Sequence, residues 1–179
     1  MPVQIGAKPD AGFDDPLAML YDCHRRVERF LKILVSVVRD ADGDTLTKAQ
    51  INSVQAALHY FRESGVKHTR DEEESLFPRI LGLISADVRQ SIENLQQEHH
   101  DADQLHDRID SLYELWIAKD ALIPQDKLDL LQTTDTLSSL YSKHIAIEES
   151  LIFPTAKSIL NSDEIRVIGH EFAMRRNVL

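Results

Sequence analysis

The chain has 179 residues, of which 42% are hydrophobic and 28% are charged, a mixture typical of one soluble globular domain. Glycine and proline occur only six times each, which leaves few residues to punctuate a many-stranded fold and favours long helices. The net charge of −10 gives no electrostatic reason to bind nucleic acid or an anionic membrane.

Residues 1–14 show no periodicity and are predicted to form an irregular N-terminal arm. The first helix is expected to begin near Asp15, because acidic residues suit the positive end of the helix dipole and Pro16 suits the first turn. His24 falls on the apolar stripe of this helix, a position that the pattern would otherwise give to a core residue. A turn is predicted at residues 40–44.

The second helix is predicted to open with a capping box at Thr47 and to close by Leu83,. Residues 64–65 (Ser-Gly) are a plausible kink or break in this helix,. Pro78 is expected to disturb or end it, because proline has no backbone N–H and crowds the preceding turn.

Two further long helices and a short one are predicted in the second half of the chain. Ser85 can cap the third helix, whose apolar stripe keeps spacings of three and four residues,. The fourth helix is expected to begin near Pro124. After Asn161, residues 162–164 are predicted to cap a last helix that reaches roughly Arg175,.

The predicted fold class is therefore all-α. Short connections make neighbouring helices antiparallel, so we expect an up-down-up-down antiparallel four-helix bundle with a short C-terminal fifth helix. One domain over residues 15–176 would contain all five.

One sequence stretch occurs twice. Residues 68–78 and 144–154 both read H-x-x-x-E-E-x-x-x-F-P. Residues four apart lie on one face of a helix, so each copy presents an imidazole beside a carboxylate. The four side chains are His68, Glu72, His144 and Glu148.

A wider register relates the two halves of the chain. His24 precedes His68 by 44 residues, and His99 precedes His144 by 45. The offset from His24 to His99 is 75 residues, and that from His68 to His144 is 76. The chain therefore reads as two copies of one helical hairpin, and four histidines and two glutamates can converge in one layer of the bundle.

Two buried carboxylates beside imidazoles are hard to explain as packing, since an unpaired buried charge costs several kcal/mol. The alternative is a layer of buried salt bridges. Divalent metal resolves the conflict by taking both groups as ligands. Imidazole with carboxylate suits iron, manganese or zinc, and six ligands with two carboxylates able to bridge favour a pair of ions, hence iron before zinc.

These residues resemble the hemerythrin-like (HHE cation-binding) family over roughly residues 15–176. The resemblance is carried by four stretches: Cys23-His24-Arg25-Arg26, both copies of the repeated motif, and Glu98-His99. It implies a non-haem di-iron centre. The implied terminal ligands are His24, His68, His99 and His144, and the implied bridges are Glu72, Glu148 and an oxo or hydroxo group.

The sequence departs from the oxygen-carrying members of that family at one position. Those members have a further histidine one turn after the third-helix histidine, where this chain has Asp103. A fifth histidine could come instead from His106, two turns after His99 and about 20° round the helix. It could also be missing, which would leave an open coordination position and favour reactivity or sensing over reversible O₂ carriage.

Three functional hypotheses follow, and whether the protein is an enzyme stays open. The first is a di-iron protein that binds or senses O₂, NO or peroxide, or handles iron under oxidative or nitrosative stress. The second is an iron donor in iron–sulfur cluster repair. The third is a metal-stabilised regulatory bundle that acts through an unknown protein partner.

The cysteine content and the absence of apolar segments indicate a cytoplasmic protein. Residues 1–15 contain no apolar stretch like that of a signal peptide,, and no apolar run approaches the roughly 20 residues that span a bilayer. A single cysteine, Cys23, excludes an internal disulfide framework,. It is expected to be a small buried residue rather than a redox-active thiol.

Overall fold

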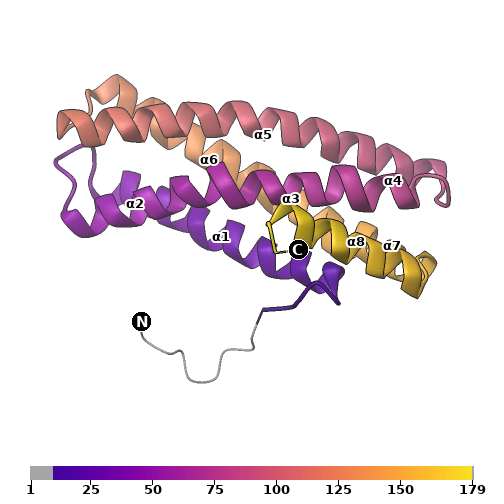
Figure 1. The fold of residues 1–179 in the computed structure, drawn as a ribbon. Coiled ribbons are helices and arrows are strands. Elements are labelled where there is room, and N and C mark those ends of the chain that lie inside the picture. The colour runs from indigo at the N-terminus through magenta and orange to yellow at the C-terminus, as the bar shows by residue number, and fades with distance from the viewer. Residues whose placement is uncertain (1–9, 179) are drawn as a thin grey trace.

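The computed structural model describes residues 10–178, and these residues form five continuous helical segments with no strand among them (Figure 1). No helix within this part of the chain has both the length and the apolar character needed to cross a membrane. The first nine residues of the predicted N-terminal arm lie outside the described range, and residues 10–15 contain no helix.

The second and fourth segments contain π-helical turns, labelled η. In chain order the elements are α1 (Pro16–Asp40), α2 (Lys48–Tyr60), η1 (Phe61–Gly65), α3 (Val66–Arg70), η2 (Asp71–Leu76), α4 (Phe77–Ile80), α5 (Ala86–Lys119), α6 (Pro124–Ile147), η3 (Glu148–Ile152), α7 (Phe153–Ile159) and α8 (Ser162–Arg175).

The helices begin close to where the sequence predicts. The side chain of Asp15 accepts a hydrogen bond from the Ala18 amide at the start of α1, and Thr47 forms the predicted capping box at the start of α2. Ser85 caps α5. The cap of α8 is Asn161 rather than residues 162–164, because the Asn161 side chain accepts from two amides of the first turn,.

The expected break in the second segment is not a break. Residues 64–65 lie in the π-helical turn η1, and the chain stays helical through them. Pro78 also does not end the helix. It lies in the first turn of α4, and the helix continues through it because the preceding turn η2 is π-helical. The Phe77 amide donates to the Glu72 carbonyl, five residues earlier. This wider turn accommodates the proline inside a continuing helix.

Two apolar clusters fill the interior, and a polar layer separates them. One cluster contains Leu34, Tyr113 and Trp116, and the other contains Phe77 and Phe153. Along α1 and α5 the chain passes the Phe77 cluster first. Along the second and fourth segments it passes the Trp116 cluster first. The candidate metal-binding residues lie between the two clusters on all four segments.

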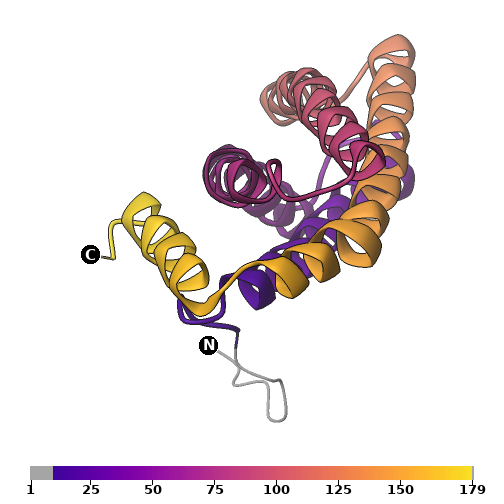
Figure 2. The ribbon, with the colours of Figure 1, turned by 90° about the vertical axis from the view of Figure 1, so that its right-hand side faces the viewer.

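The four long segments lie side by side, and α8 lies along one flank of them (Figures 1 and 2). Helix α8 contacts α1 and η2. Gly169 permits this close approach, since a Cβ atom at that position would lie 1.8 Å from the carbonyl oxygen of Phe13.

An ion cluster holds the end of α8 against η2. The carboxylate of Asp71, which is fully buried, accepts hydrogen bonds from Arg175 at 2.7 Å and from Arg176 at 2.6 Å. Arg175 also donates to the hydroxyl of Ser75 at 2.7 Å. The cluster therefore fixes the backbone turn that carries Glu72, the next residue after Asp71.

We expect the Asp71→Ala variant to lose about 3 kcal/mol of unfolding free energy, because removing one partner of a buried ion cluster leaves the others uncompensated. Urea unfolding followed by circular dichroism measures this loss. The matched control is Asp135→Ala, which breaks the exposed ion pair with Arg39 and should change stability by no more than about 1 kcal/mol. Equal losses in the two variants would contradict the proposed role of Asp71.

Candidate metal centre

The four histidines and two glutamates singled out in the sequence meet in one layer of the interior. Their fractional exposures lie between 0 and 7%. They come from all four long segments: His24 from α1, His68 and Glu72 from α3 and η2, His99 from α5, and His144 and Glu148 from α6 and η3.

The carboxylate of Glu72 lies between histidines of both halves of the chain. Its Oε1 is 3.4 Å from the Nε2 of His68 and 3.8 Å from the Nε2 of His24. Its Oε2 is 3.4 Å from the Nε2 of His99. One carboxylate therefore presents a different oxygen to each half.

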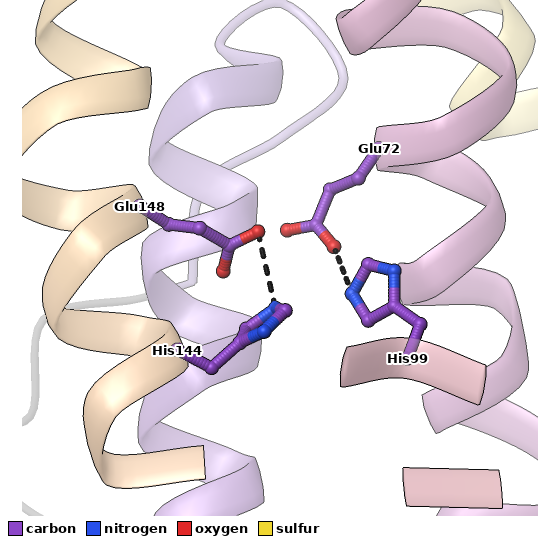
Figure 3. A group of neighbouring side chains, drawn as sticks. All are labelled: Glu72, His99, His144 and Glu148. Atoms are coloured by element: carbon purple, nitrogen blue, oxygen red, sulfur yellow. Dashed lines mark ion pairs between the residues drawn. The ribbon is translucent and has the colours of Figure 1, made fainter. Parts of the chain in front are cut away.

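Glu148 has the same arrangement. Its Oε1 is 3.3 Å from the Nε2 of His144, and its Oε2 is 3.1 Å from the Nε2 of His24. Figure 3 shows Glu72 and Glu148 facing each other, with His99 and His144 beside them.

Two groups of ligand atoms are compact enough to surround a metal ion. The first is formed by Glu72, His99, His144 and Glu148, and the second by His24, His68 and Glu72. Within each group the candidate ligand atoms all lie within 4.8 Å of one another. Glu72 belongs to both groups, as a bridging carboxylate would.

Three carboxylates orient three of the imidazoles from outside the layer. Glu149 lies 2.9 Å from the Nδ1 of His24, and Glu73 lies 2.8 Å from the Nδ1 of His99. Such contacts fix the tautomer in which Nδ1 carries the proton and Nε2 faces inward as a ligand. Glu73 and Glu149 are the second glutamates of the two copies of the repeated motif.

The third of these carboxylates had no role predicted from the sequence. Glu98 lies 2.9 Å from the Nδ1 of His144, although it neighbours a different histidine in sequence. It directly precedes His99 and belongs to the residues that carry the family resemblance. No local sequence pattern marks this contact, because it depends on how far one helix slides along the other.

The buried groups shift one another's pKa values strongly. Although burial lowers it, the carboxylates of Glu148 and Glu72 raise the pKa of His24 to about 10. The pKa of His99 is also raised to about 10 by Glu72 and Glu73, against the effect of burial. The pKa of His68 is lowered to about 4, chiefly by burial.

The carboxylates of Glu72 and Glu148 keep their charge despite complete burial. Burial alone would raise the pKa of Glu72, but the histidines around it hold that pKa well below its ordinary value. The pKa of Glu148 is lowered by His144 and His24, against burial and the repulsion from Glu72. Two negative charges in one dry layer therefore depend on positive charge close by.

The two weaker ligand candidates, Asp103 and His106, are less buried than the six residues of the layer. Asp103 is exposed. Partial burial of its carboxyl group raises the pKa of that group. His106 is half-buried, and its Nε2 lies 3.0 Å from the hydroxyl of Tyr141. Neither residue belongs to the two compact groups of ligand atoms found among the described residues.

A hollow of about 520 Å³ opens on the surface beside the layer. Its lining includes Phe61, His106 and Tyr141, together with Glu73, which contacts His99. Tyr141 also packs edge-on against His144, with 6.2 Å between the ring centres. Glu73 and Tyr141 therefore line the hollow on one side and contact the His99 and His144 imidazoles on the other.

The residues present fit a pair of metal ions. Both oxygens of Glu72 and both oxygens of Glu148 are buried without a hydrogen-bond partner among the described residues. The Nε2 atoms of His24 and His144 are likewise buried without a hydrogen-bond partner among the described residues. Buried polar atoms without a hydrogen bond are rare because each costs about 1–3 kcal/mol. Here these atoms face one another only as ion pairs of 3.1–3.8 Å, and they converge on the same small volume as potential ligand atoms.

Comparison with known proteins agrees with the resemblance inferred from the sequence. The chain is 28% identical over 169 residues to a protein of Haemophilus influenzae described as an uncharacterized protein, and the match covers 94% of each chain. The family model of the hemerythrin HHE cation-binding domain matches residues 15–156, which include all six buried residues of the layer. The chain therefore belongs to the hemerythrin HHE cation-binding domain family.

Proposed function

We propose that the protein binds two iron ions in the layer of four histidines and two glutamates. The observation that carries this proposal is the placement of the two carboxylates, each with one oxygen toward either half of the layer. A single ion would not require both oxygens of both carboxylates. Zinc or manganese could bind the same set of ligands.

The ligand count supports binding of a small molecule at the ions. His24 and His68 would hold one ion, and His99 and His144 would hold the other. Glu72 and Glu148 would each give one carboxylate oxygen to each ion. Each ion would then receive four protein atoms, whereas iron in such sites commonly has six positions. Two iron ions held in this way supply redox chemistry and open coordination positions.

We infer that the open positions serve to bind or sense O₂, NO or peroxide, or to handle iron under oxidative or nitrosative stress. The hollow lined by His106 and Tyr141 supports this inference, because it offers a small molecule an approach to the layer. The residues around the layer would orient the imidazoles and exclude bulk water.

The arrangement of the helices that this site requires is an up-down-up-down antiparallel four-helix bundle, which we also infer. It is supported by the order of the two apolar clusters, which reverses from each long segment to the next. A histidine early in α1 and α5 can then lie level with a histidine late in the second and fourth segments.

Anaerobic reconstitution with Fe²⁺ should load about two ions per chain, and oxidation in air should then produce charge-transfer absorption bands typical of a bridged iron pair. We expect Glu72→Gln to weaken metal binding by more than about 100-fold, since loss of an outer partner alone costs about 10–100-fold. The control is Glu63→Gln, an exposed residue of the same segment. One tightly bound zinc ion per chain would refute the proposal.

The loaded protein also separates the alternative functions. Transfer of iron to an apo iron–sulfur protein would favour a repair role over binding of a small molecule. If Glu72→Gln combined with Glu148→Gln only destabilised the fold, and the loaded wild-type protein bound no small ligand, the metal would be structural.

Metal binding at pH 7 should release at least two protons per chain, because His24 and His99, each with a pKa raised to about 10 in the metal-free protein, must lose a proton to become ligands,. The pKa of His144 is also raised, by Glu148 against the effect of burial, so His144 adds to this release. His68, whose pKa is lowered to about 4, is already neutral. Affinity should therefore rise with pH from 6 to 8. Calorimetry in buffers of different ionisation enthalpy counts the protons, and heats that do not depend on the buffer would contradict the assignment. Substitution of the exposed His170 by Gln should leave the count unchanged.

A further inference from the structure

One of the four imidazoles lacks the outer support that the other three have. The Nδ1 atoms of His24, His99 and His144 each lie within 2.9 Å of a glutamate oxygen. The Nδ1 of His68 is buried and has no hydrogen-bond partner among the described residues. The half of the layer formed by His24 and His68 is therefore less completely held than the other half.

The internal repeat shows where the missing partner would be. Glu149 and Glu73, which support His24 and His99, are themselves 76 residues apart and so occupy equivalent positions. Glu98, which supports His144, directly precedes His99. The residue 75 positions earlier directly precedes His24, and it is Cys23.

Cys23 is buried, whereas its counterpart Glu98 is partly exposed. The Cys23 side chain is 7% exposed, and its backbone carbonyl accepts a hydrogen bond from the Tyr60 hydroxyl at 3.3 Å. A thiol is a weak hydrogen-bond acceptor and brings no negative charge to an imidazole N–H. The repeat thus has a glutamate in one half and a poor acceptor at the equivalent position in the other.

The chemical consequence concerns metal affinity. A carboxylate on the outer nitrogen of a ligating histidine fixes the ring and raises the basicity of the inner nitrogen, and its loss typically costs about 10–100-fold in affinity. The His99 and His144 imidazoles both have this support. In the other pair, His24 has such a carboxylate and His68 does not. The carboxylate beside His24 belongs to Glu149, which also pairs with Arg25.

We propose that the two ion positions are unequal, with a firmly held divalent cation at His99 and His144 and an exchangeable one at His24 and His68. This inference rests on the proposed two-metal function. It assigns Glu98 and Cys23 as the residues that set the difference. The exchangeable position is the one from which an ion would leave first.

Anaerobic calorimetric titration of the metal-free protein with Fe²⁺ should give two dissociation constants that differ by about 10–100-fold. His68→Ala should abolish the weaker event and leave the tighter one. A titration in which His68→Ala removes the tighter event would overturn the assignment. Repulsion between two bound ions could also separate the two constants, so two matched variants decide the cause.

The first variant removes the support from the stronger half. Glu98→Ala should weaken the tighter event by about 10–100-fold and bring the two constants together. Glu93→Ala, at an exposed position on the same helix, should leave both unchanged. Glu98 is itself partly exposed, so its replacement leaves the core intact. An unchanged tighter constant in Glu98→Ala would refute the proposal.

The second variant supplies the missing support. Cys23→Glu should strengthen the weaker event, whereas Cys23→Ala should leave the gap as it is. If Cys23→Glu does not fold, the Glu98→Ala comparison still decides the proposal. Failure to bind more than one Fe²⁺ in the wild-type protein would instead contradict the two-metal function, so the two failures are distinguishable.

Discussion

The structure depends on keeping two carboxylate charges in a dry layer between two apolar clusters. Glu72 and Glu148 are fully buried, and each faces imidazole nitrogens from both halves of the chain. Transfer of an isolated charge to such a place is prohibitively costly. The layer is therefore stable only with compensating positive charge, from protonated histidines in the metal-free protein or from metal ions. Every long helix contributes to this compensation, which is why the layer also holds the helices in register.

The π-helical turns η2 and η3 connect the repeated motif to this layer. Each contains one of the two buried glutamates, and in each the glutamate carbonyl accepts a hydrogen bond from the phenylalanine amide five residues later. The Phe-Pro pair that ends the motif thus has a structural reason: the widened turn accommodates proline while the phenylalanine packs into the apolar cluster below the layer. Turns of this kind recur at functional sites, and here they occur at equivalent places in both halves.

The sequence was sufficient to predict the helix starts, the six buried residues and the two-fold register, because all three depend on local caps or on helical periodicity. It did not reveal the π-helical turns, because each widened turn shifts the buried positions by a single residue, to steps of four such as His144, Glu148 and Ile152, and so short a shift resembles ordinary helical spacing. Glu98 was missed for a different reason. Its contact with His144 depends on how far one helix slides along the other, and that distance is set by packing across the whole interior. His106 lies on nearly the same face of α5 as His99, but it is two turns further along the helix. Its Nε2 atom contacts the hydroxyl of Tyr141 instead of the layer.

Departures from the two-fold repeat gather on one side of the layer. Cys23 stands where Glu98 stands in the other half. Asp71, bound to Arg175 and Arg176, stands 76 residues before Ile147, an apolar residue without such partners. Helix α8, which follows the second hairpin, supplies these arginines and has no equivalent after the first. The extra helix therefore fixes the backbone beside Glu72 in the same half of the layer where the outer support of His68 is missing. On the proposed assignment, ion pairs that hold the backbone beside Glu72 would keep the geometry of the weaker position after its ion leaves. The imidazoles of the other half, His99 and His144, are instead oriented by glutamates.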